Sequence, residues 1–356
     1  MKVVNANAQY KLYGDNLVVY DKLPADVYII RFNELQGFYL EKYSMEINEE
    51  KVYGVHKSKI EKVKNAFKNS QRSLGVILSG DKGIGKSLFA RMLSLESVDN
   101  GYPVIIVDRY VQGINSFIEE IEQEVVVLFD EFDKTFVDND GDNCAQTSML
   151  SLFDGVAAGK KLYIVTCNNV YKLNEYLINR PGRFHYHFRF KYPTSEEIKI
   201  YLQDKLDKKY WSEIDSVINF CGKVELNYDC LRAIAFELQN GETFEDAIND
   251  LNVINIDEQK YDVLLTFKDG KTLARESVSI NMFSSKPQKF WVENMEEDES
   301  LYVEFSPQNV IYDYTKGLSS IESKYLKLSQ NKKYKNTNVE SAVFKRTIMN
   351  TYNYAI

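Results

Sequence analysis

The stretch GDKGIGKS at residues 80–87 constrains the fold of this chain more than any other feature of its sequence. Gly80, Gly85, Lys86 and Ser87 satisfy the pattern G-x-x-x-x-G-K-[ST], in which glycines let the backbone wrap closely with its N–H groups turned inward. The apolar run LGVILS precedes the loop, and SLFARMLSLES follows it with helical spacing. Because a strand leads into the loop and a helix leaves it, the sequence predicts a phosphate-binding loop rather than a chance glycine turn.

A loop of this kind binds a nucleoside triphosphate through its backbone N–H groups and through a few side chains. We expect Lys86 to reach the β- and γ-phosphates and the Ser87 hydroxyl to ligate Mg²⁺. The N-terminus of the following helix adds a partial positive charge. The predicted ATP-binding residues of the loop are Gly80, Asp81, Lys82, Gly83, Ile84, Gly85, Lys86, Ser87 and Leu88.

The segment VVVLFDEFD supplies the acidic half of the predicted site. An apolar strand at residues 125–129 ends in Asp130 and Glu131. Asp130 at the carboxyl end of the strand would hold Mg²⁺ through water, and Glu131 would orient and polarise the attacking water. The combination of this segment with the phosphate loop predicts hydrolysis of ATP with Mg²⁺ as the metal.

Two further polar segments follow the acidic pair. The strand KLYIVT ends in CNN, where a polar side chain can position water against the γ-phosphate. Arg180 and Arg183 flank a Pro–Gly turn in RPGR, and arginine there can stabilise charge on the transferring phosphoryl group. Because they follow the fourth strand, away from their own phosphate loop, we expect them to serve a neighbouring subunit. Surface salt bridging is the alternative role.

Residues 74–190 alternate short apolar strands with helices. Strands are expected at 74–79, 104–108, 125–129, 161–166 and 185–190, with helices at about 86–97, 114–123 and 145–158. Such alternation predicts an α/β fold in which a parallel sheet is covered on both faces.

The remaining parts of the chain differ from this pattern. The N-terminal residues read as strands, and TSEEIKIYLQDKL opens a helical part with a capping-box pattern, Thr194 or Ser195 with Glu197. Asp269–Gly270 predicts a hairpin in a later run of strands. The predicted domains are a β-rich N-terminal segment at 1–50, a nucleotide-binding α/β domain at 51–193, a helical lid at 194–252 and a small β-rich C-terminal domain with a polar tail at 253–356.

The order of these motifs resembles the classical AAA clade of AAA+ ATPases. GDKGIGKS, VVVLFDE, LFDG, VTCNN and NRPGRF follow one another as in that clade, over about residues 50–250. The resemblance implies a five-stranded parallel core of order 5-1-4-3-2, a helical lid and a homo-oligomeric ring, usually a hexamer, with ATP sites between subunits. By position, Asn169 matches the sensor asparagine, and Arg180 and Arg183 match the paired arginine fingers. Tyr53–Gly54 resembles the segment that lies on the adenine.

The resemblance also implies a use for the energy of hydrolysis. DRYVQG matches the first pore loop of the clade, and the acidic loop at 138–143 matches the second. Tyr110 and Val111 are therefore expected to project into a central channel, where a flat aromatic side chain grips many polypeptide sequences by van der Waals contact. The expected function is a ring that remodels, unfolds or disassembles a protein client. A solvent loop with one packed tyrosine is the other interpretation of DRYVQG.

Two other classes of function stay open. A motor or loader acting on DNA or RNA would need basic residues in the channel, and the net charge of −8 and the acidic loop at 138–143 argue against a phosphate track. A non-hydrolysing scaffold would not need an intact acidic pair. Four cysteines outside any C-x-x-C pair, and a longest apolar run of only VVVLF, predict a reduced cytoplasmic protein with no membrane span.

Overall fold

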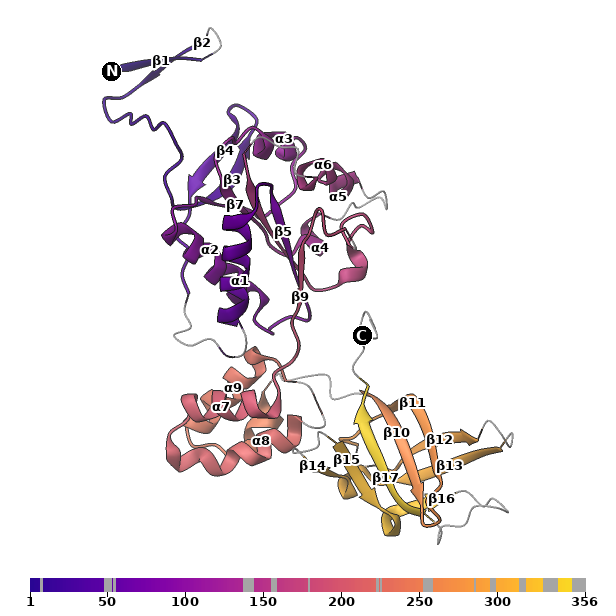
Figure 1. Ribbon diagram of the computed structural model, residues 1–356. Helices are drawn as coiled ribbons and strands as arrows, with labels where there is room; N and C mark the ends of the chain where they lie inside the picture. The colour runs from indigo at the N-terminus through magenta and orange to yellow at the C-terminus, as the bar shows by residue number, and fades with distance from the viewer. Residues whose placement is uncertain are drawn as a thin grey trace. The chain divides into compact units, whose positions relative to one another are not determined.

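The chain divides into two compact units, Met1–Phe190 and Lys191–Ile356 (Figure 1). The computed structural model describes residues 1–6, 9–47, 53, 56–136, 144–154, 159–178, 180–221, 224, 226–251, 259–284, 286–294, 299–313, 318–328 and 339–347.

A seven-stranded sheet of order β4-β3-β6-β7-β8-β5-β9 forms the centre of the first unit. β4 runs antiparallel to β3, and all other neighbouring strands are parallel. Every residue of β5, β6, β7 and β8 is buried, as expected for parallel strands covered on both faces. The strands are β3 Val27–Asn33, β4 Gly37–Lys42, β5 Leu74–Ser79, β6 Val104–Val107, β7 Val125–Phe129, β8 Lys161–Cys167 and β9 Tyr186–Arg189.

The β3–β4 hairpin makes the sheet larger than the five strands expected from the sequence. Val27, Tyr28 and Ile29 pair in parallel with residues 104–106 of β6. Residues 27–42 therefore belong to the main sheet, which has seven strands where five were expected. The five expected strands lie in it as β9-β5-β8-β7-β6, and β3 and β4 extend it beyond β6. A local pattern predicts that a segment is a strand, whereas its partner in a sheet is set by contacts between segments far apart in the sequence.

Helices cover the two faces of this sheet. On one face, α1 (His56–Asn69) and α2 (Lys86–Asp99) bury Phe67 and Phe89 against even-numbered residues of β5, β7 and β8. On the other face, Phe129 and Tyr163 pack in an aromatic cluster with residues of α4 and α6. Alternate residues of a strand point to opposite faces, which accounts for the two cores. The short helices are α3 Ile114–Glu119, α4 Phe132–Thr135, α5 Cys144–Ser148 and α6 Leu150–Phe153.

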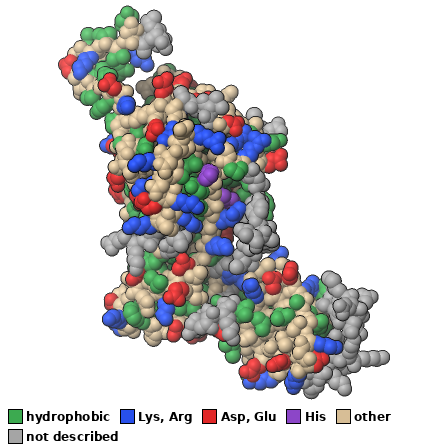
Figure 2. Space-filling model, in the orientation of Figure 1, with side chains coloured by type: hydrophobic (Ala, Val, Ile, Leu, Met, Phe, Trp, Pro, Cys, Tyr) green, Lys and Arg blue, Asp and Glu red, His purple; other side chains and the backbone are tan. Residues whose placement is uncertain are grey.

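The first strands of the chain form a separate two-stranded sheet. β1 (Lys2–Ala6) pairs antiparallel with β2 (Gln9–Tyr13). Val3, Tyr10 and Leu12 are 54%, 70% and 66% exposed, and Figure 2 shows hydrophobic side chains on the surface of this hairpin. The hairpin therefore buries little of its own apolar surface.

The second unit begins with helices. Thr194 caps the first of them with a complete capping box, in which the Glu197 N–H donates to Thr194 Oγ1 and the Thr194 N–H donates to the Glu197 carboxylate. This confirms the capping pattern and selects Thr194 over Ser195. The helices are α7 Ser195–Lys205, η2 Lys208–Glu213, α8 Ile214–Cys221, α9 Tyr228–Gln239 and α10 Phe244–Asp250. Over the described ranges of the whole chain, no helix has both the length and the apolar character needed to cross a bilayer.

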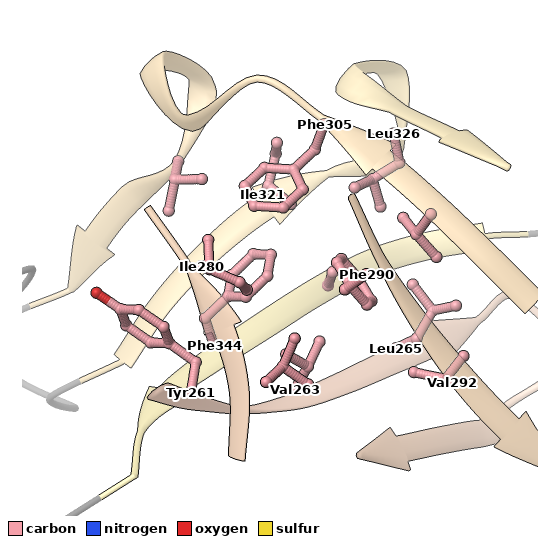
Figure 3. Packing of buried hydrophobic residues seen from close by; sticks show 14 of the residues in the cluster. Tyr261, Val263, Leu265, Ile280, Phe290, Val292, Phe305, Ile321, Leu326 and Phe344 are labelled. Atoms are coloured by element: carbon pink, nitrogen blue, oxygen red, sulfur yellow. The ribbon is translucent and has the colours of Figure 1, made fainter. Parts of the chain in front are cut away.

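Two antiparallel sheets follow, of orders β11-β10-β17-β15-β14 and β12-β13-β16. Figure 3 shows that they share one core, in which Phe290 and Phe305 from the smaller sheet pack against Phe344 of the larger. The predicted turn at Asp269–Gly270 joins β10 to β11, and Gly270 has φ +82°. The strands are β10 Gln259–Phe267, β11 Thr272–Ile280, β12 Gln288–Asn294, β13 Glu299–Phe305, β14 Ile311–Asp313, β15 Leu318–Glu322, β16 Leu326–Leu328 and β17 Val339–Arg346.

Candidate functional site

The phosphate loop connects the end of β5 to the start of α2. Gly80, Gly83 and Gly85 have φ values of +140°, +73° and +94°, which residues with a Cβ rarely adopt. A Cβ at Gly80 would lie 2.5 Å from Ile84 Cδ1 and 2.6 Å from the Phe190 carbonyl oxygen, so only glycine fits there. The loop is thus a tight turn that ends at the N-terminus of a 14-residue helix, where backbone N–H groups without helical partners favour an anion.

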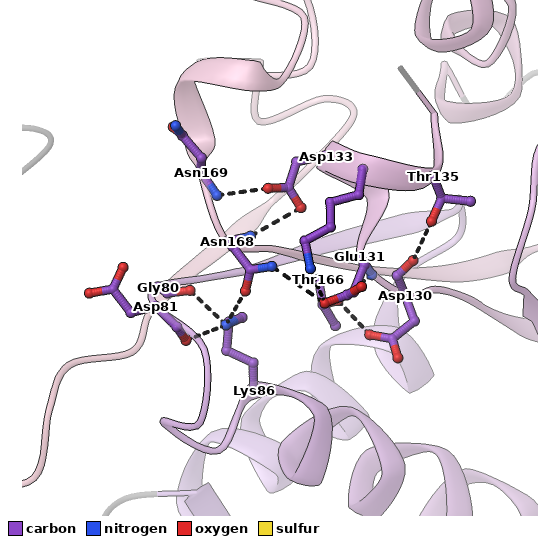
Figure 4. A network of polar contacts seen from close by, with 11 residues as sticks. Gly80, Asp81, Lys86, Asp130, Glu131, Asp133, Thr135, Thr166, Asn168 and Asn169 are labelled. Atoms are coloured by element: carbon purple, nitrogen blue, oxygen red, sulfur yellow. Dashed lines mark hydrogen bonds and ion pairs between the residues drawn. The ribbon is translucent and has the colours of Figure 1, made fainter. Parts of the chain in front are cut away.

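Lys86 is the central cation of the loop. It is 7% exposed, and its Nζ donates to the carbonyl oxygens of Gly80 and Asp81, both at 2.6 Å, and to Asn168 Oδ1 at 2.9 Å (Figure 4). Burial lowers the pKa of Lys86. Its contacts with the Gly80 and Asp81 carbonyl oxygens place the ammonium group on the loop that would surround the phosphates.

Asp130 and Glu131 follow β7, and Thr166 of the neighbouring strand β8 fixes both. Thr166 Oγ1 donates to Asp130 Oδ1 at 2.6 Å and accepts the Glu131 N–H at 2.8 Å. Glu131 has φ +47° and ψ +45°, a left-handed conformation that is uncommon for a residue with a side chain. This conformation and the Thr166 contacts fix the backbone of the acidic pair at the carboxyl end of the sheet.

The Glu131 carboxylate contacts Lys134 and Asn168. Its Oε1 accepts from Lys134 Nζ and, at 3.5 Å, from Asn168 Nδ2. The Lys134 contact is the main reason why the pKa of Glu131 lies below its ordinary value. Glu131 is therefore ionised at neutral pH, as an acceptor of a proton from water must be.

Asn168 occupies the position expected for Asn169. Its side chain bridges Lys86 and Glu131, whereas Asn169 is exposed and its Oδ1 accepts the Tyr171 N–H at 2.9 Å as the cap of η1 (Val170–Lys172). The structure thus brings Asn168, and not Asn169, between the lysine and the acid. The reason is the turn after β8, which directs Asn169 toward the start of η1.

The two predicted arginine fingers differ in their environments. Arg183 is 9% exposed; its Nε and Nη2 donate to the Asp154 carboxylate, the latter at 2.7 Å, and its Nη1 donates to the Tyr176 carbonyl oxygen at 2.7 Å. These bonds within the chain leave Arg183 in a structural ion pair rather than directed at a neighbour. Arg180 is exposed, with its guanidinium carbon 5.5 Å from the centre of the Tyr176 ring.

Tyr110, one of the two predicted pore residues, packs against other residues of its own chain. Tyr110 and Val111 are half-buried, and the Tyr110 ring packs 5.7 Å from that of Phe136. Ser148 Oγ donates to the Tyr110 hydroxyl at 3.2 Å. Tyr110 is thus the packed tyrosine of the alternative interpretation, because the aromatic cluster beneath the sheet extends to it. The acidic loop at 138–143 lies outside the described residues.

The remaining residues that were predicted to bind the nucleotide differ in their exposure to solvent. Ile84 is buried under the loop, Lys82 and Ser87 are exposed, and Leu88 is half-buried. Tyr53 is half-buried, and Gly54 lies outside the described residues. The structure therefore brings the phosphate and acidic residues together, while the adenine segment stays a prediction.

Sequence reasoning missed three residues of this network. Thr166 is a polar residue near the end of an apolar strand, and this position was a usable signal. Asp133 is 2% exposed, and its Oδ1 and Oδ2 accept the N–H groups of Asn168 at 3.1 Å and Asn169 at 2.9 Å. Lys134 contacts Glu131 three residues before it in the chain. No sequence pattern distinguishes these roles from those of ordinary surface charges.

The residues present fit ATP with Mg²⁺. Ser87 and Asp130 supply hydroxyl and carboxylate oxygens, the ligands that Mg²⁺ prefers, and this metal usually keeps phosphate oxygens as further ligands. Within the ranges that the structure describes, no group of three or more His, Cys, Asp or Glu side chains could hold a metal alone.

A glycine loop at the head of a helix, an acidic pair after another strand of the same sheet and an amide between them form the arrangement typical of P-loop NTPases. Residues 58–192 match the family model of Novel STAND NTPase 3.

The chain is also similar to parts of several curated ATPases. The chain is 31% identical over 157 residues to the ATPase family gene 2 protein of Saccharomyces cerevisiae, covering 40% of this chain and 20% of the yeast protein. It is 25% identical over 156 residues to an "AAA ATPase forming ring-shaped complexes" of Corynebacterium jeikeium, covering 37% and 30%. It is 23% identical over 226 residues to the proteasome-associated ATPase of a Nocardioides species, covering 55% and 38%. The chain spans less than two fifths of the length of each of these relatives, and the proteins to which it is similar are ATPases.

Proposed function

We propose that this chain is a magnesium-dependent ATPase of the classical AAA clade that works as a homo-oligomeric ring, a hexamer by analogy with the clade. The observation that carries the ATPase activity is the position of Asn168, whose two amide atoms contact Lys86 of the phosphate loop and Glu131 of the acidic pair. A lysine for phosphate and a carboxylate for water are thereby brought to one point, as hydrolysis of a phosphoanhydride requires.

The reaction follows from the roles of these groups. The loop N–H groups and Lys86 bind the phosphates, and Mg²⁺ at Ser87 and Asp130 would neutralise their charge. Glu131 accepts a proton from water while the water oxygen bonds to the γ-phosphorus. The bond from that phosphorus to the β–γ bridging oxygen breaks, and the electron pair leaves on ADP. Asn168 takes the sensor role beside the γ-phosphate.

The exposed Arg180 completes the site in this proposal. A guanidinium from a neighbouring copy would stabilise charge on the transferring phosphoryl group. Arg183 forms an ion pair with Asp154 of its own chain, so we assign the arginine-finger role to Arg180 alone. The arrangement requires the ring, since Arg180 serves the site of another copy.

Remodelling of a protein client is the proposed use of the energy, in the cytoplasm. Support comes from the relatives, one named for ring-shaped complexes and one for association with the proteasome. The packing of Tyr110 removes the aromatic grip from this part of the proposal. The test is whether a variant that binds ATP without hydrolysing ATP captures a protein client. Lys86→Ala is the variant for comparison. Stimulation of ATP hydrolysis by single-stranded DNA, without a captured protein, would favour the motor or loader.

The test of the ATPase is the Glu131→Gln substitution. It keeps the size of the side chain but removes the base, so we expect kcat to fall by about a hundredfold or more while ATP still binds. Steady-state ATP hydrolysis and binding of a fluorescent ATP analogue measure the two effects. Glu120→Gln, an exposed residue at the end of α3, is the control. Hydrolysis at the wild-type rate by Glu131→Gln would show that another group activates water.

A further inference from the structure

Helix α4 begins directly after Glu131 and is only one turn long. Two of its four residues are charged, and both face the site. Asp133 is 2% exposed, and its carboxylate accepts the N–H groups of Asn168 and Asn169. A buried carboxylate is costly unless its oxygens are hydrogen-bonded, so these two bonds fix the backbone that carries the Asn168 side chain.

Lys134 contacts the acid itself. Its Nζ forms an ion pair with Glu131 Oε1, one helical turn before it. Asn168 Nδ2 reaches the same oxygen at 3.5 Å. Both donors therefore hold one oxygen of the carboxylate from two directions, as Figure 4 shows for the Asn168 side.

The Glu131 side chain needs such support. It is 50% exposed, and an unrestrained glutamate samples several rotamers, which lowers the fraction of time that the carboxylate faces the water. The backbone of Glu131 is already fixed by its left-handed conformation and by Thr166. The contacts to Oε1 fix the remaining side-chain torsions of Glu131. They therefore also fix the position of the second carboxylate oxygen.

We propose that α4 is a positioning element, in which Lys134 orients the Glu131 carboxylate and Asp133 orients Asn168. The proposal rests on the proposed ATPase function. Lys134 and Asp133 are positioning residues, since each acts through a group that faces the substrate. Catalytic groups must be held within a fraction of an ångström of the productive geometry, and neighbours that lock their rotamers provide this.

The competing account is that the Lys134 pair is an ordinary exposed ion pair. Lys134 is 37% exposed, and exposed pairs contribute little to stability. Both accounts therefore predict little change in the free energy of unfolding when Lys134 is substituted, and they differ in the kcat that they predict. Positioning requires a loss of kcat without a loss of ATP affinity, whereas a surface pair affects neither.

The experiment compares Lys134→Met with Lys134→Arg in the full chain. We expect Lys134→Met to lower kcat about threefold to fivefold, with KM for ATP unchanged, because an exposed ion pair contributes on this scale. Lys134→Arg keeps the charge and should retain most of the activity. Lys68→Met, which removes an exposed lysine from the last turn of α1, is the matched control and should match the wild type.

A double substitution identifies the group through which Lys134 acts. In the Glu131→Gln background, Lys134→Met should cause no further loss, because the carboxylate that it orients is gone. An equal loss in both backgrounds, an unchanged kcat or a raised kcat would overturn the proposal. Absence of ATP hydrolysis by the wild type would instead overturn the proposed function itself. Asp133→Asn should lower kcat in the same way, and unchanged hydrolysis by folded Asp133→Asn would overturn its role.

Discussion

Arg180 and Arg183 stand three residues apart, and the turn between them separates their roles. The N–H groups of Arg183 and Phe184 both donate to the Arg180 carbonyl oxygen, so the backbone reverses within RPGR. One guanidinium is thereby directed inward to Asp154 and the other outward. Arg183 thus holds the segment that displays Arg180, and its substitution should affect folding before it affects the reaction.

Arg183→Ala should destabilise the protein. It leaves Asp154 without its bidentate partner and the Tyr176 carbonyl oxygen without a donor, and we expect the free energy of unfolding to fall by about 2 kcal/mol. Urea denaturation measures the change. Arg180→Ala, at an exposed position, should stay within about 0.5 kcal/mol of the wild type. Equal effects of the two substitutions would contradict the separation of roles.

His187 gives the stability of the first unit a dependence on pH. Its Nε2 lies 2.7 Å from Ser79 Oγ, and burial, with a smaller effect of Arg189, lowers its pKa from 6.5 to about 4. Between these values the unfolded chain binds a proton that the folded chain does not. The contribution of His187 is therefore complete above about pH 6.5 and is lost as the pH falls toward 4.

His187→Gln should flatten this part of the pH dependence. Thermal unfolding at about pH 7 and pH 5 should show a smaller loss of Tm on acidification than in the wild type, because glutamine takes up no proton. His185→Gln, exposed directly before β9, is the matched control. An identical loss of Tm in wild type and His187→Gln would show that other groups carry the acid sensitivity.

The residue roles could be predicted only where a motif fixes them. The phosphate loop and the acidic pair lie at the ends of β5 and β7, as expected, because backbone geometry dictates where such side chains stand. Asn168 and Asn169 are adjacent and chemically identical, and only the turn after β8 decides which of them faces the site. The same is true of the two arginines, whose directions depend on a turn that no local pattern encodes.

At the scale of elements, β5 connects the phosphate loop to the RPGRF segment. The His185 N–H donates to the Gly75 carbonyl oxygen at 2.9 Å, and β9 then pairs with β5 in parallel. A Cβ at Gly75 would lie 2.3 Å from the Arg183 carbonyl oxygen and 2.6 Å from Phe184 Cδ1. The segment that carries Arg180 is thus packed against the strand that carries the loop.

Gly75→Ala should force these elements apart. Backbone atoms cannot yield as a flexible side chain would, and we expect a loss of about 1–3 kcal/mol in the free energy of unfolding. Gly182→Ala is the control, since its Cβ would meet no atom within 4 Å. Chemical denaturation of the two variants gives the comparison. Equal stability of Gly75→Ala and wild type would contradict the close contact.

The bounds of two strands in which every residue is buried were predicted correctly. The strand at 125–129 was predicted with its observed bounds, and so was that at 74–79. Over its described residues, the predicted helix at 145–158 is divided into two short helices, α5 and α6, and the helix at 114–123 ends at Glu119. Helical spacing of apolar residues continues across such breaks, so the pattern alone does not locate them.

At the scale of the whole molecule, the sequence predicted the α/β class but not the size of the sheet. The strands at 27–42 read as an N-terminal segment, and their pairing with β6 depends on contacts that are not local. The C-terminal β-rich part was expected, although its order, with β17 between β10 and β15, was not. Long-range pairing is set by the summed packing of both faces rather than by any one strand.

The central claim is that two copies of the chain build each active site, one with its phosphate loop and the other with Arg180. Mixing two inactive variants tests it most directly. Lys86→Ala retains Arg180, and Arg180→Ala retains the loop, so an equal mixture should contain some complete sites. The account predicts ATP hydrolysis by the mixture well above the sum of the two variants alone. A mixture no more active than that sum would contradict it and would leave the site complete within a single chain.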